Sequence, residues 1–364
     1  MKLKKYYVPF FIFLCVIVLT ACDDKSRIQT TAKNENSDEL IVIDYLSREV
    51  AIPKKIDRIA CLYAYTGHVV TMLGDGNKIV AVNNGLKLDR LLHKINPVIK
   101  DAVVPNQQTK INIEELANAN PDLILIQEAI AQDEGEVRKL EEMKIPYLVV
   151  NFNSMKEQQQ SIAMIGKVLG KSEKAKQFND FYNEMIALVT ERVKDIPDED
   201  KVRVYHSVME ATRTDPAGSL PAEWMKVAGA INVSVGEDLK LVEKKYFASI
   251  EQILLWDPDV ILVNQDGVAD YILDSPQWQT LKAVKANKVF QLPNGVSRWG
   301  HPGGLETPLA IIWTAKTLYP DRFANVDLAE ITAEFYENFF DYTLQPDEMK
   351  QILSGKDMRA PKGN

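Results

Sequence analysis

The chain has 364 residues, of which 46% are hydrophobic and 26% charged. This apolar content is enough for a large buried core and the length predicts about two domains, which excludes a wholly disordered, collagen-like or coiled-coil chain. With 43 basic and 51 acidic residues, a net charge of −8 and no basic tract, nucleic acid is excluded as an expected partner, because neutralising phosphates requires clustered Lys and Arg.

The N-terminus has the features of an export signal. Three lysines precede an apolar run over residues 6–19, which is short for a membrane-spanning helix. The run leads into the tetrapeptide LTAC, which ends at Cys22 and resembles the lipobox of bacterial lipoproteins. The sequence therefore predicts a cleaved signal peptide over 1–21 and a lipid on Cys22 that anchors the protein to the extracytoplasmic face of the cell membrane. The alternative is an ordinary signal peptide followed by an unmodified cysteine.

The segment after the signal contains almost no large apolar side chains. Residues 22–39 are polar, and we expect them to form a flexible tether. Because Cys15 leaves with the signal peptide and Cys22 carries the lipid, Cys61 is the one thiol left in the folded body. A single thiol forms no internal disulfide, so Cys61, which lies in an apolar run, is expected to be a small core residue.

Short aliphatic runs recur along the chain, with helical patterns between them. A run without polar alternation suits a strand that is buried on both faces, as in a parallel sheet covered by helices. The predicted fold class is therefore α/β with mostly parallel sheets. The predicted strands are 58–63, 78–83, 122–126, 146–150, 202–208, 259–263 and 288–292.

An internal repeat indicates two lobes. Residues 113–126 (IEELANANPDLILI) and 250–263 (IEQILLWDPDVILV) each read as a short amphipathic helix, a Pro-Asp stop and an aliphatic strand. The same unit at two places in the chain predicts two lobes of related α/β build, and a chance match is the alternative.

One long helix is predicted between the two repeat units. From Ser172 to Asp195 apolar residues recur in steps of three and four, and Pro197 follows. We expect Ser172 to be the N-cap of this helix, and a helix at the lobe junction would act as a stiff strut. The predicted organisation is an N-terminal lobe over 40–171, the interdomain helix over 172–195, a C-terminal lobe over 196–353 and a polar tail over 354–364.

In the order and spacing of these features the sequence resembles the helical-backbone, or class III, substrate-binding proteins of ABC importers. The stretch 41–82 resembles the start of that family, and 228–232 (AGAIN) and 334–353 resemble its later parts. The resemblance covers nearly all of 40–353. It implies two Rossmann-like lobes joined by one helix, a ligand held in the cleft between them, and delivery to an ABC permease dimer with its ATPase. We expect a monomer.

The resemblance also implies two docking residues. Family members carry an exposed glutamate on each lobe that pairs with arginines of the permease, and Glu114 and Glu251 occupy the matching positions ahead of the two Pro-Asp strands. Two carboxylates at equivalent sites on separate lobes suit a dimeric partner. The alternative is that each carboxylate only stabilises the N-terminus of its own helix.

Aromatic, basic and histidine side chains gather in the loops that follow the predicted strands, where ligands collect in open α/β sheets. Aromatic surface and arginine suit a large planar or anionic chelate. His68 has the alternative of a packed or capping residue, and His206 that of a core residue within its strand. Trp299 is expected to be exposed in a Gly-rich loop and to need a partner there. The candidate ligand-binding residues are Tyr63, Tyr65, His68, His206, Arg213, Arg298, Trp299 and His301.

The expected ligand is an iron chelate, either a ferric siderophore or haem. Cobalamin or another corrinoid and a free transition-metal ion are the alternatives, although the histidine supply is small for a dedicated metal site. No cofactor of the protein's own and no catalytic residue are expected. The rival classes are a structural lipoprotein and an extracytoplasmic hydrolase that uses Glu210 or Glu128 with His206, but no spacing of nucleophile and base supports the hydrolase.

Overall fold

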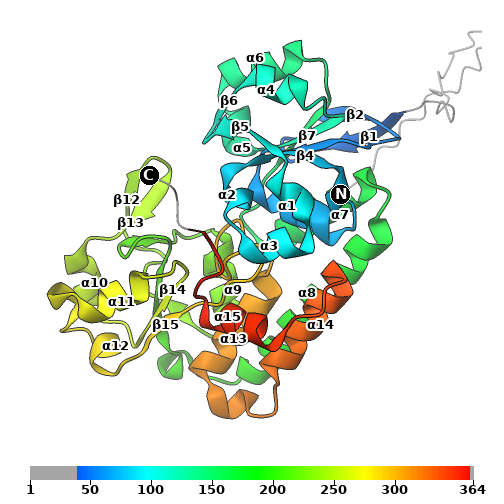
Figure 1. Cartoon of the computed structure of the whole chain (residues 1–364). Coiled ribbons are helices and arrows are strands. Elements are labelled where there is room, and N and C mark those ends of the chain that lie inside the picture. The colour runs from blue at the N-terminus through cyan, green and yellow to red at the C-terminus, as the bar shows by residue number, and fades with distance from the viewer. Residues whose placement is uncertain (1–38, 361–364) are drawn as a thin grey trace, which may run out of the picture. The chain divides into compact units, whose positions relative to one another are not determined.

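Two separate sheets of mainly parallel strands organise the computed structural model, which describes residues 39–360 (Figure 1). The N-terminal sheet has six strands in the order β6-β5-β4-β3-β7-β8, and all its pairs are parallel except β5 with β6. The strands β3 and β8 are buried along their whole length, and β7 at all but its last residue, because helices cover the faces of the sheet. Its strands are β3 Ile59–Cys61, β4 Ile79–Asn83, β5 Val103–Gln107, β6 Lys110–Ile111, β7 Leu123–Gln127 and β8 Tyr147–Val150.

The C-terminal sheet has four parallel strands in the order β11-β9-β14-β15. They are β9 Arg203–Ser207, β11 Ile231–Asn232, β14 Val260–Val263 and β15 Val289–Gln291. All seven strands predicted from aliphatic runs are present, and the predicted α/β class is confirmed. The two repeat units form α4 (Ile113–Asn118) with β7 and α10 (Ile250–Trp256) with β14, so that each ends in an interior strand of its sheet.

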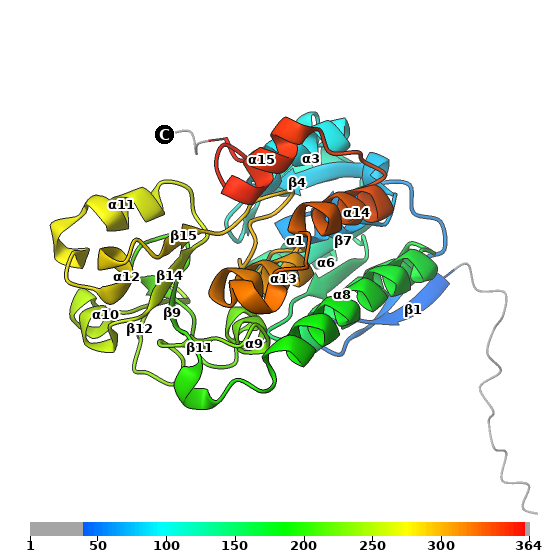
Figure 2. The same ribbon diagram turned by 90° about the horizontal axis from the view of Figure 1, so that it is seen from below.

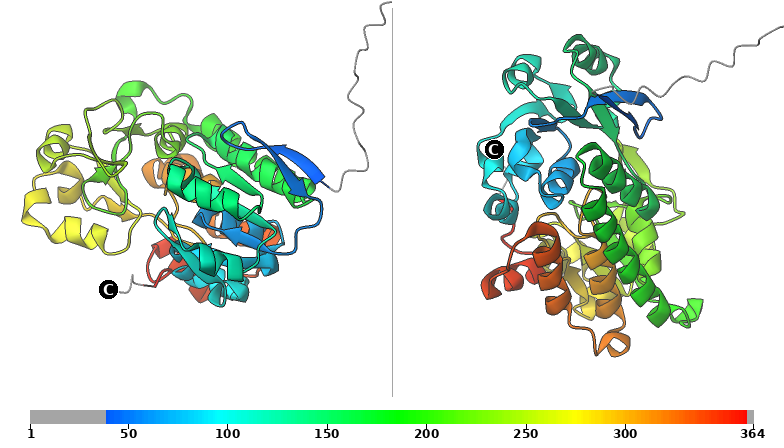
Figure 3. Two further views of the ribbon diagram at one scale, coloured as in Figure 1. Left: turned by 90° about the horizontal axis from the view of Figure 1, so that it is seen from above. Right: turned by 90° about the vertical axis from the view of Figure 1, so that its right-hand side faces the viewer.

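The long helix α8 runs from Ser172 to Val193, two residues short of the predicted end. Its N-cap is Lys171, so the expectation that Ser172 caps the helix is wrong: Ser172 already has helical geometry, and no side chain caps this end. Apolar side chains of α8 pack against α7 (Met155–Val168) and α13 (Thr307–Leu318), which lie beside it in the right-hand view of Figure 3.

The last helices of the chain return to the N-terminal sheet. The ring of Phe339 in α14 (Leu328–Phe340) lies 5.1 Å from that of Phe178 in α8, and Figure 2 shows these helices together. A continuous hydrophobic core, which includes α8, extends from Val42 to Met358. The C-terminal segment therefore contributes to the packing of both sheets, and the lobe boundaries drawn from the sequence stay a proposal.

The remaining elements connect or cover the sheets. The helices are α1 Ala64–Met72, α2 Asn84–Lys87, α3 Arg90–Ile95, α5 Glu128–Ala131, α6 Glu134–Glu142, α9 Leu220–Val227, α11 Val268–Asp274, α12 Lys282–Lys285 and α15 Pro346–Ser354. The strands outside the two main sheets are β1 Glu39–Ile43, β2 Glu49–Pro53, β10 Arg213–Thr214, β12 Lys240–Val242 and β13 Lys245–Phe247.

Within residues 39–360 no helix has both the length and the apolar character needed to cross a membrane. The predicted signal peptide, the lipidated Cys22, the tether except for Glu39, and residues 361–364 of the predicted tail lie outside the described residues. Cys61 is a buried free thiol in β3, as expected.

Candidate functional site

Two adjoining cavities, of about 1340 and 520 Å³, open between the carboxyl ends of the two sheets. Four residues line both cavities, so that the two form one cleft. Asn83 at the end of β4 and Gln127 at the end of β7 contribute from one side, and residues after β9, β14 and β15 contribute from the other. This placement follows the rule that ligands of open α/β sheets bind beyond the carboxyl ends of strands. The four shared residues are Asn83, Gly85, Arg298 and Arg359.

Both arginines that were predicted to bind the ligand line this cleft. Arg298 lines both cavities and Arg213, from β10, lines the smaller one. No carboxylate of the described residues lies within 4.0 Å of either guanidinium as an ion-pair partner. Arg298 donates from Nη1 to Oε1 of Gln265 at 3.3 Å, while its Nε is buried without a hydrogen-bond partner.

The charges of these arginines are poorly compensated. Burial first, and then the positive charge of Arg213, lower the pKa of Arg298 to about 10. Burial also lowers the pKa of Arg213, although Glu210 and Asp215 oppose that shift. A partly buried cation without an ion-pair partner is costly, so this part of the cleft is suited to an anion.

A buried carboxylate holds the loop that carries Arg298. Glu306 is 0% exposed and accepts hydrogen bonds at Oε2 from the backbone N–H of Ser297 at 2.6 Å and from its Oγ at 2.9 Å, and at Oε1 from the hydroxyl of Tyr336. Burial raises the pKa of Glu306. Gly295 is required beside it, because a Cβ there would stand 1.8 Å from the Tyr336 oxygen.

The expectation that Trp299 is exposed is wrong. Its side chain is 0% exposed and belongs to the hydrophobic core, and it lines neither cavity. Residues 297–304 form a compact turn whose neighbouring side chains point in different directions. Arg298 and His301 face the cleft, while the indole between them packs inward, where its large apolar surface is removed from water.

The four histidines are placed differently. His68 and His301 line the smaller cavity, whereas His206, in β9, is fully buried and lines neither cavity. His68 Nε2 lies 3.0 Å from Asp89 Oδ2, and His206 Nδ1 lies 2.6 Å from Asp215 Oδ2. His93 was not a candidate ligand-binding residue and lines neither cavity. Its Nε2 contacts the Leu86 carbonyl oxygen.

The two imidazoles in the cleft are neutral at pH 7. Burial lowers the pKa of His68 to about 3. The pKa of His301 is well below its usual range, because of burial first and then the charges of Arg298 and Arg213. His301 Nδ1 accepts a hydrogen bond from the Gly303 N–H at 3.0 Å, a contact that requires the unprotonated nitrogen.

The two tyrosines do not face the same way. Tyr63 lines the smaller cavity, but the Tyr65 hydroxyl lies in the core 2.9 Å from Ser161 Oγ and lines neither cavity. Of these two candidate ligand-binding residues only Tyr63 reaches the cleft, because α1 begins at Ala64. In a helix, residues two apart point in nearly opposite directions, whereas in a strand they share a face.

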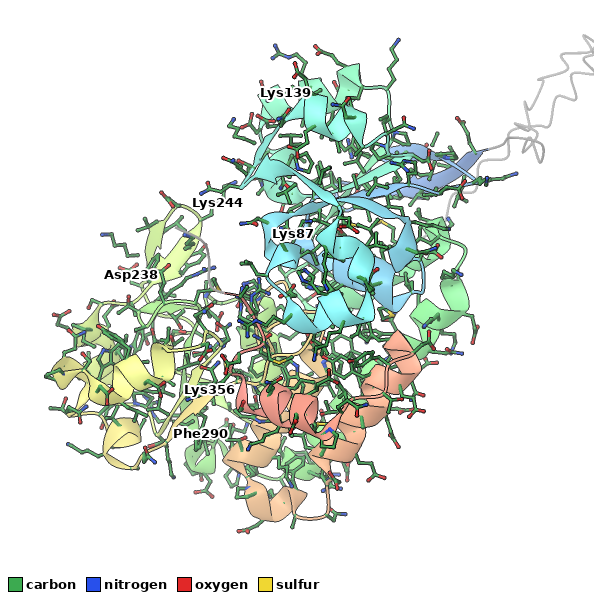
Figure 4. The ribbon with its side chains drawn as sticks, viewed as in Figure 1. Lys87, Lys139, Asp238, Lys244, Phe290 and Lys356 are labelled. Atoms are coloured by element: carbon green, nitrogen blue, oxygen red, sulfur yellow. The ribbon has the colours of Figure 1, made fainter. Side chains whose placement is uncertain are left out.

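Cationic residues that the sequence analysis missed also line the cleft. Lys244 and Lys245 belong to the β12–β13 turn and strand, and Lys244 lies at the end of that hairpin, which is turned toward the N-terminal sheet (Figure 4). There its Nζ contacts Oε1 of Gln132, which ends α5. Arg359 comes from the predicted polar tail and lines both cavities. No local sequence pattern pointed to these residues, because each reaches the site through contacts that are distant in sequence.

Glu114 and Glu251 lie outside the cleft. Both are exposed in the first turn of their helices, α4 and α10, and the caps Asn112 and Ser249 accept from the backbone N–H of the residue three positions on. The Glu251 backbone N–H and the Ser249 hydroxyl lower the pKa of the Glu251 carboxyl. The helix-stabilising role and a docking role are therefore both compatible with this geometry.

No group of three or more His, Cys, Asp and Glu side chains is arranged to hold a metal ion in the part of the chain that the structure describes. Two of the three residues named for a hydrolase have side-chain partners in the fold. His206 pairs with Asp215, and Glu128 accepts hydrogen bonds from Asn151 and Gln132.

Comparison with known proteins gives one consistent result. A family model described as periplasmic binding protein matches residues 59–296. Molybdate-binding protein MolA of Haemophilus influenzae is 26% identical over 334 residues, which cover 84% of this chain and 92% of that protein. The heme uptake protein IsdE of Staphylococcus aureus is 24% identical over 250 residues, which cover 66% and 75% of the two chains.

Solved structures agree in fold. MolA bound to molybdate superposes with a TM-score of 0.75 at 25% identity, covering 85% of this chain and all of that one. Helicobacter pylori CeuE with Ni(II) bound gives a TM-score of 0.70 at 22% identity over 86% of this chain and all of that one, which is a likeness of fold alone. MolA is named as the periplasmic molybdate-binding protein of an ABC transporter and IsdE as a protein of a heme uptake system, so the ligands named for these relatives differ.

Proposed function

Since this chain belongs to the periplasmic binding protein family, we propose that it captures a compact oxyanion of the molybdate class outside the cell membrane and delivers it to an ABC importer. One observation carries the choice of ligand: Arg298 and Arg213 face one cleft, and no described carboxylate forms an ion pair with either. A guanidinium donates parallel N–H bonds to oxyanions. The similarity to a molybdate-binding protein over most of both chains supports the same choice.

An anionic ferric chelate is the second candidate ligand. The larger cavity, at about 1340 Å³, exceeds what a tetrahedral oxyanion fills, and Tyr63 supplies aromatic surface next to it in the smaller one. A relative in heme uptake supports this class. Both candidates are anions, so the arginines serve either. A bare cation is disfavoured because these side chains would repel it.

Attachment and delivery complete the proposal. A lipid on Cys22 would hold the protein at the extracytoplasmic face of the cell membrane. Glu114 and Glu251, one on each repeat unit, would pair with arginines of a permease dimer. The protein itself performs no chemistry in this scheme. It binds, is recognised in its loaded form, and releases its ligand.

Calorimetric titration of the full chain, purified in detergent, tests the ligand. We expect saturable binding of molybdate and tungstate at one site, with sulfate as the smaller competitor. Ferric citrate and haem are added to separate samples and followed by visible absorbance. Binding of a ferric chelate without oxyanion binding would favour the second candidate. Binding of Ni²⁺ alone, with neither class of anion bound, would overturn the proposal of an anion site.

A further inference from the structure

The chain does not end at its last helix. After α15 it continues through residues 355–360, which we call the C-terminal strap. Gly355 starts the strap with φ +68°, and a Cβ there would lie 2.2 Å from the Leu292 carbonyl oxygen. Glycine is therefore needed for the chain to leave α15 and turn along the end of β15.

The strap is bound to the N-terminal part of the fold by its backbone. The N–H of Arg90 donates to the Met358 carbonyl at 3.0 Å, and the N–H of Ala360 donates to the Leu88 carbonyl at 2.9 Å. These bonds form an antiparallel bridge that places Asp89 opposite Arg359. The Met358 side chain is 4% exposed and packs into the core. The strap is thus a built part of the structure.

The other side of the strap contacts the segment after β14. The N–H of Asp357 donates to Oδ2 of Asp266 at 3.3 Å, and Lys356 Nζ lies 3.6 Å from Oδ2 of Asp270 in α11. Figure 4 shows Lys356 directly after α15, on the side of the C-terminal sheet. The strap therefore joins the two walls of the cleft.

Arg359 points from the strap into this cleft. Its side chain is 16% exposed and is one of the four that line both cavities, together with Arg298. Its Nη1 contacts Oδ1 of Asp89, and its Nη2 donates to the Gly85 carbonyl at 2.9 Å. Burial lowers its pKa to about 10, so it is charged at pH 7.

Asp89 holds this arginine in place. Its carboxylate is 1% exposed and carries two partners, His68 Nε2 on one oxygen and Arg359 on the other. A guanidinium has five N–H groups, and two of the Arg359 nitrogens are engaged at Asp89 and Gly85. The remaining N–H groups are available to an acceptor in the cavities that the side chain lines.

We propose that Arg359 is a ligand-binding residue, and that the C-terminal strap supplies it to the seam of the two cavities, where it and Arg298 donate to the same anion. The inference rests on the proposed capture of an anion. Asp89 acts as a positioning residue, which orients the Arg359 guanidinium without touching the ligand.

A double-mutant cycle separates this role from simple neutralisation of Asp89. Arg359→Gln alone leaves a buried carboxylate without its partner, which can weaken the fold as well as the site. Asp89→Asn with Arg359→Gln removes both charges, so that no unpaired carboxylate remains. Asp89→Asn alone keeps the Arg359 guanidinium and its contact with the Gly85 carbonyl but removes the carboxylate that orients it. Lys356→Gln, on the same strap, is the matched control because Lys356 lines neither cavity.

Calorimetric titration of the full chain with molybdate, or with ferric citrate if molybdate is not bound, gives the dissociation constants, and thermal melting gives the stability. We expect Arg359→Gln and the double variant each to bind about ten-fold more weakly than wild type. Melting should recover in the double variant, whereas affinity should not. Asp89→Asn should bind more weakly than wild type but more tightly than the double variant, because it keeps the Arg359 guanidinium without the carboxylate that orients it, and Lys356→Gln should not differ from wild type.

The outcomes separate the two proposals. If the double variant binds as tightly as Asp89→Asn, Arg359 serves only to neutralise Asp89, and the inference is overturned while anion capture stands. If wild type binds neither anion, the proposed function fails, and the role of the strap fails with it.

Discussion

The backbone N–H of Ser297 donates to Oε2 of Glu306 at 2.6 Å, in a part of the fold from which water is excluded. This contact closes the loop that carries Arg298 and His301. The carboxylate also receives the Ser297 and Tyr336 hydroxyls, so a charge that burial penalises is offset by three donors. The position of the Arg298 guanidinium therefore depends on a buried carboxylate behind the loop.

Replacing this carboxylate should loosen the site. Glu306→Gln keeps the size of the side chain, but its NH₂ group then faces one of the hydrogen-bond donors that the carboxylate accepts from. We therefore expect a loss of about 2 kcal/mol in the free energy of unfolding and weaker anion binding. Urea denaturation and titration measure the two effects. The exposed Glu334→Gln in α14 is the control and should change neither. Unchanged stability of Glu306→Gln would contradict the role assigned to the carboxylate.

Arg298 should show opposite effects on binding and stability. Arg298→Gln removes a charge-assisted donor, and we expect anion affinity to fall about 10- to 100-fold. Because the same change removes a poorly compensated buried cation, the ligand-free protein should melt at a higher temperature. Arg138→Gln, at an exposed position of α6, should leave both quantities unchanged. A variant with lower stability and full affinity would show that Arg298 is structural.

His301 should make the protein sensitive to acid. Its folded-state pKa is lowered, so below pH 6.5 the unfolded chain binds a proton that the folded chain does not. Stability therefore falls as pH drops. Between pH 7.5 and 5.5 this one group contributes up to about 1.4 kcal/mol. Thermal melts of His301→Gln should show a smaller loss over this interval than wild type. An identical pH dependence would mean that the pKa of His301 does not change on folding.

Delivery can be separated from capture at the two exposed glutamates. Glu114→Lys combined with Glu251→Lys should abolish uptake of labelled ligand by cells, because like charges then meet at the permease. Affinity of the purified variant should stay within about two-fold of wild type, as for other surface changes. The same reversals at Glu134 and Glu337, which are also exposed, are the control and should leave uptake intact. Loss of affinity in the first variant would contradict a docking role.

Much of the fold could be predicted because its causes are local. The aliphatic runs that became β7 and β14 have no polar alternation, and a strand buried on both faces needs none. The spacing of apolar residues in α8 predicted its length within two residues. Glu114 and Glu251 were placed correctly in the first turns of their helices, because the Pro-Asp repeat marks the same element in both sheets.

The site was predicted less completely, because side-chain direction depends on contacts between distant segments. Tyr63 and Tyr65 separate where a helix begins, and Trp299 turns into a core built by residues far from it in the chain. Arg359 reaches the cleft by pairing with Asp89, 270 positions earlier. Periodicity in the sequence thus determined which segments become strands and helices, whereas only tertiary packing decided which charges share one cavity, since Coulomb interaction depends on distance in space.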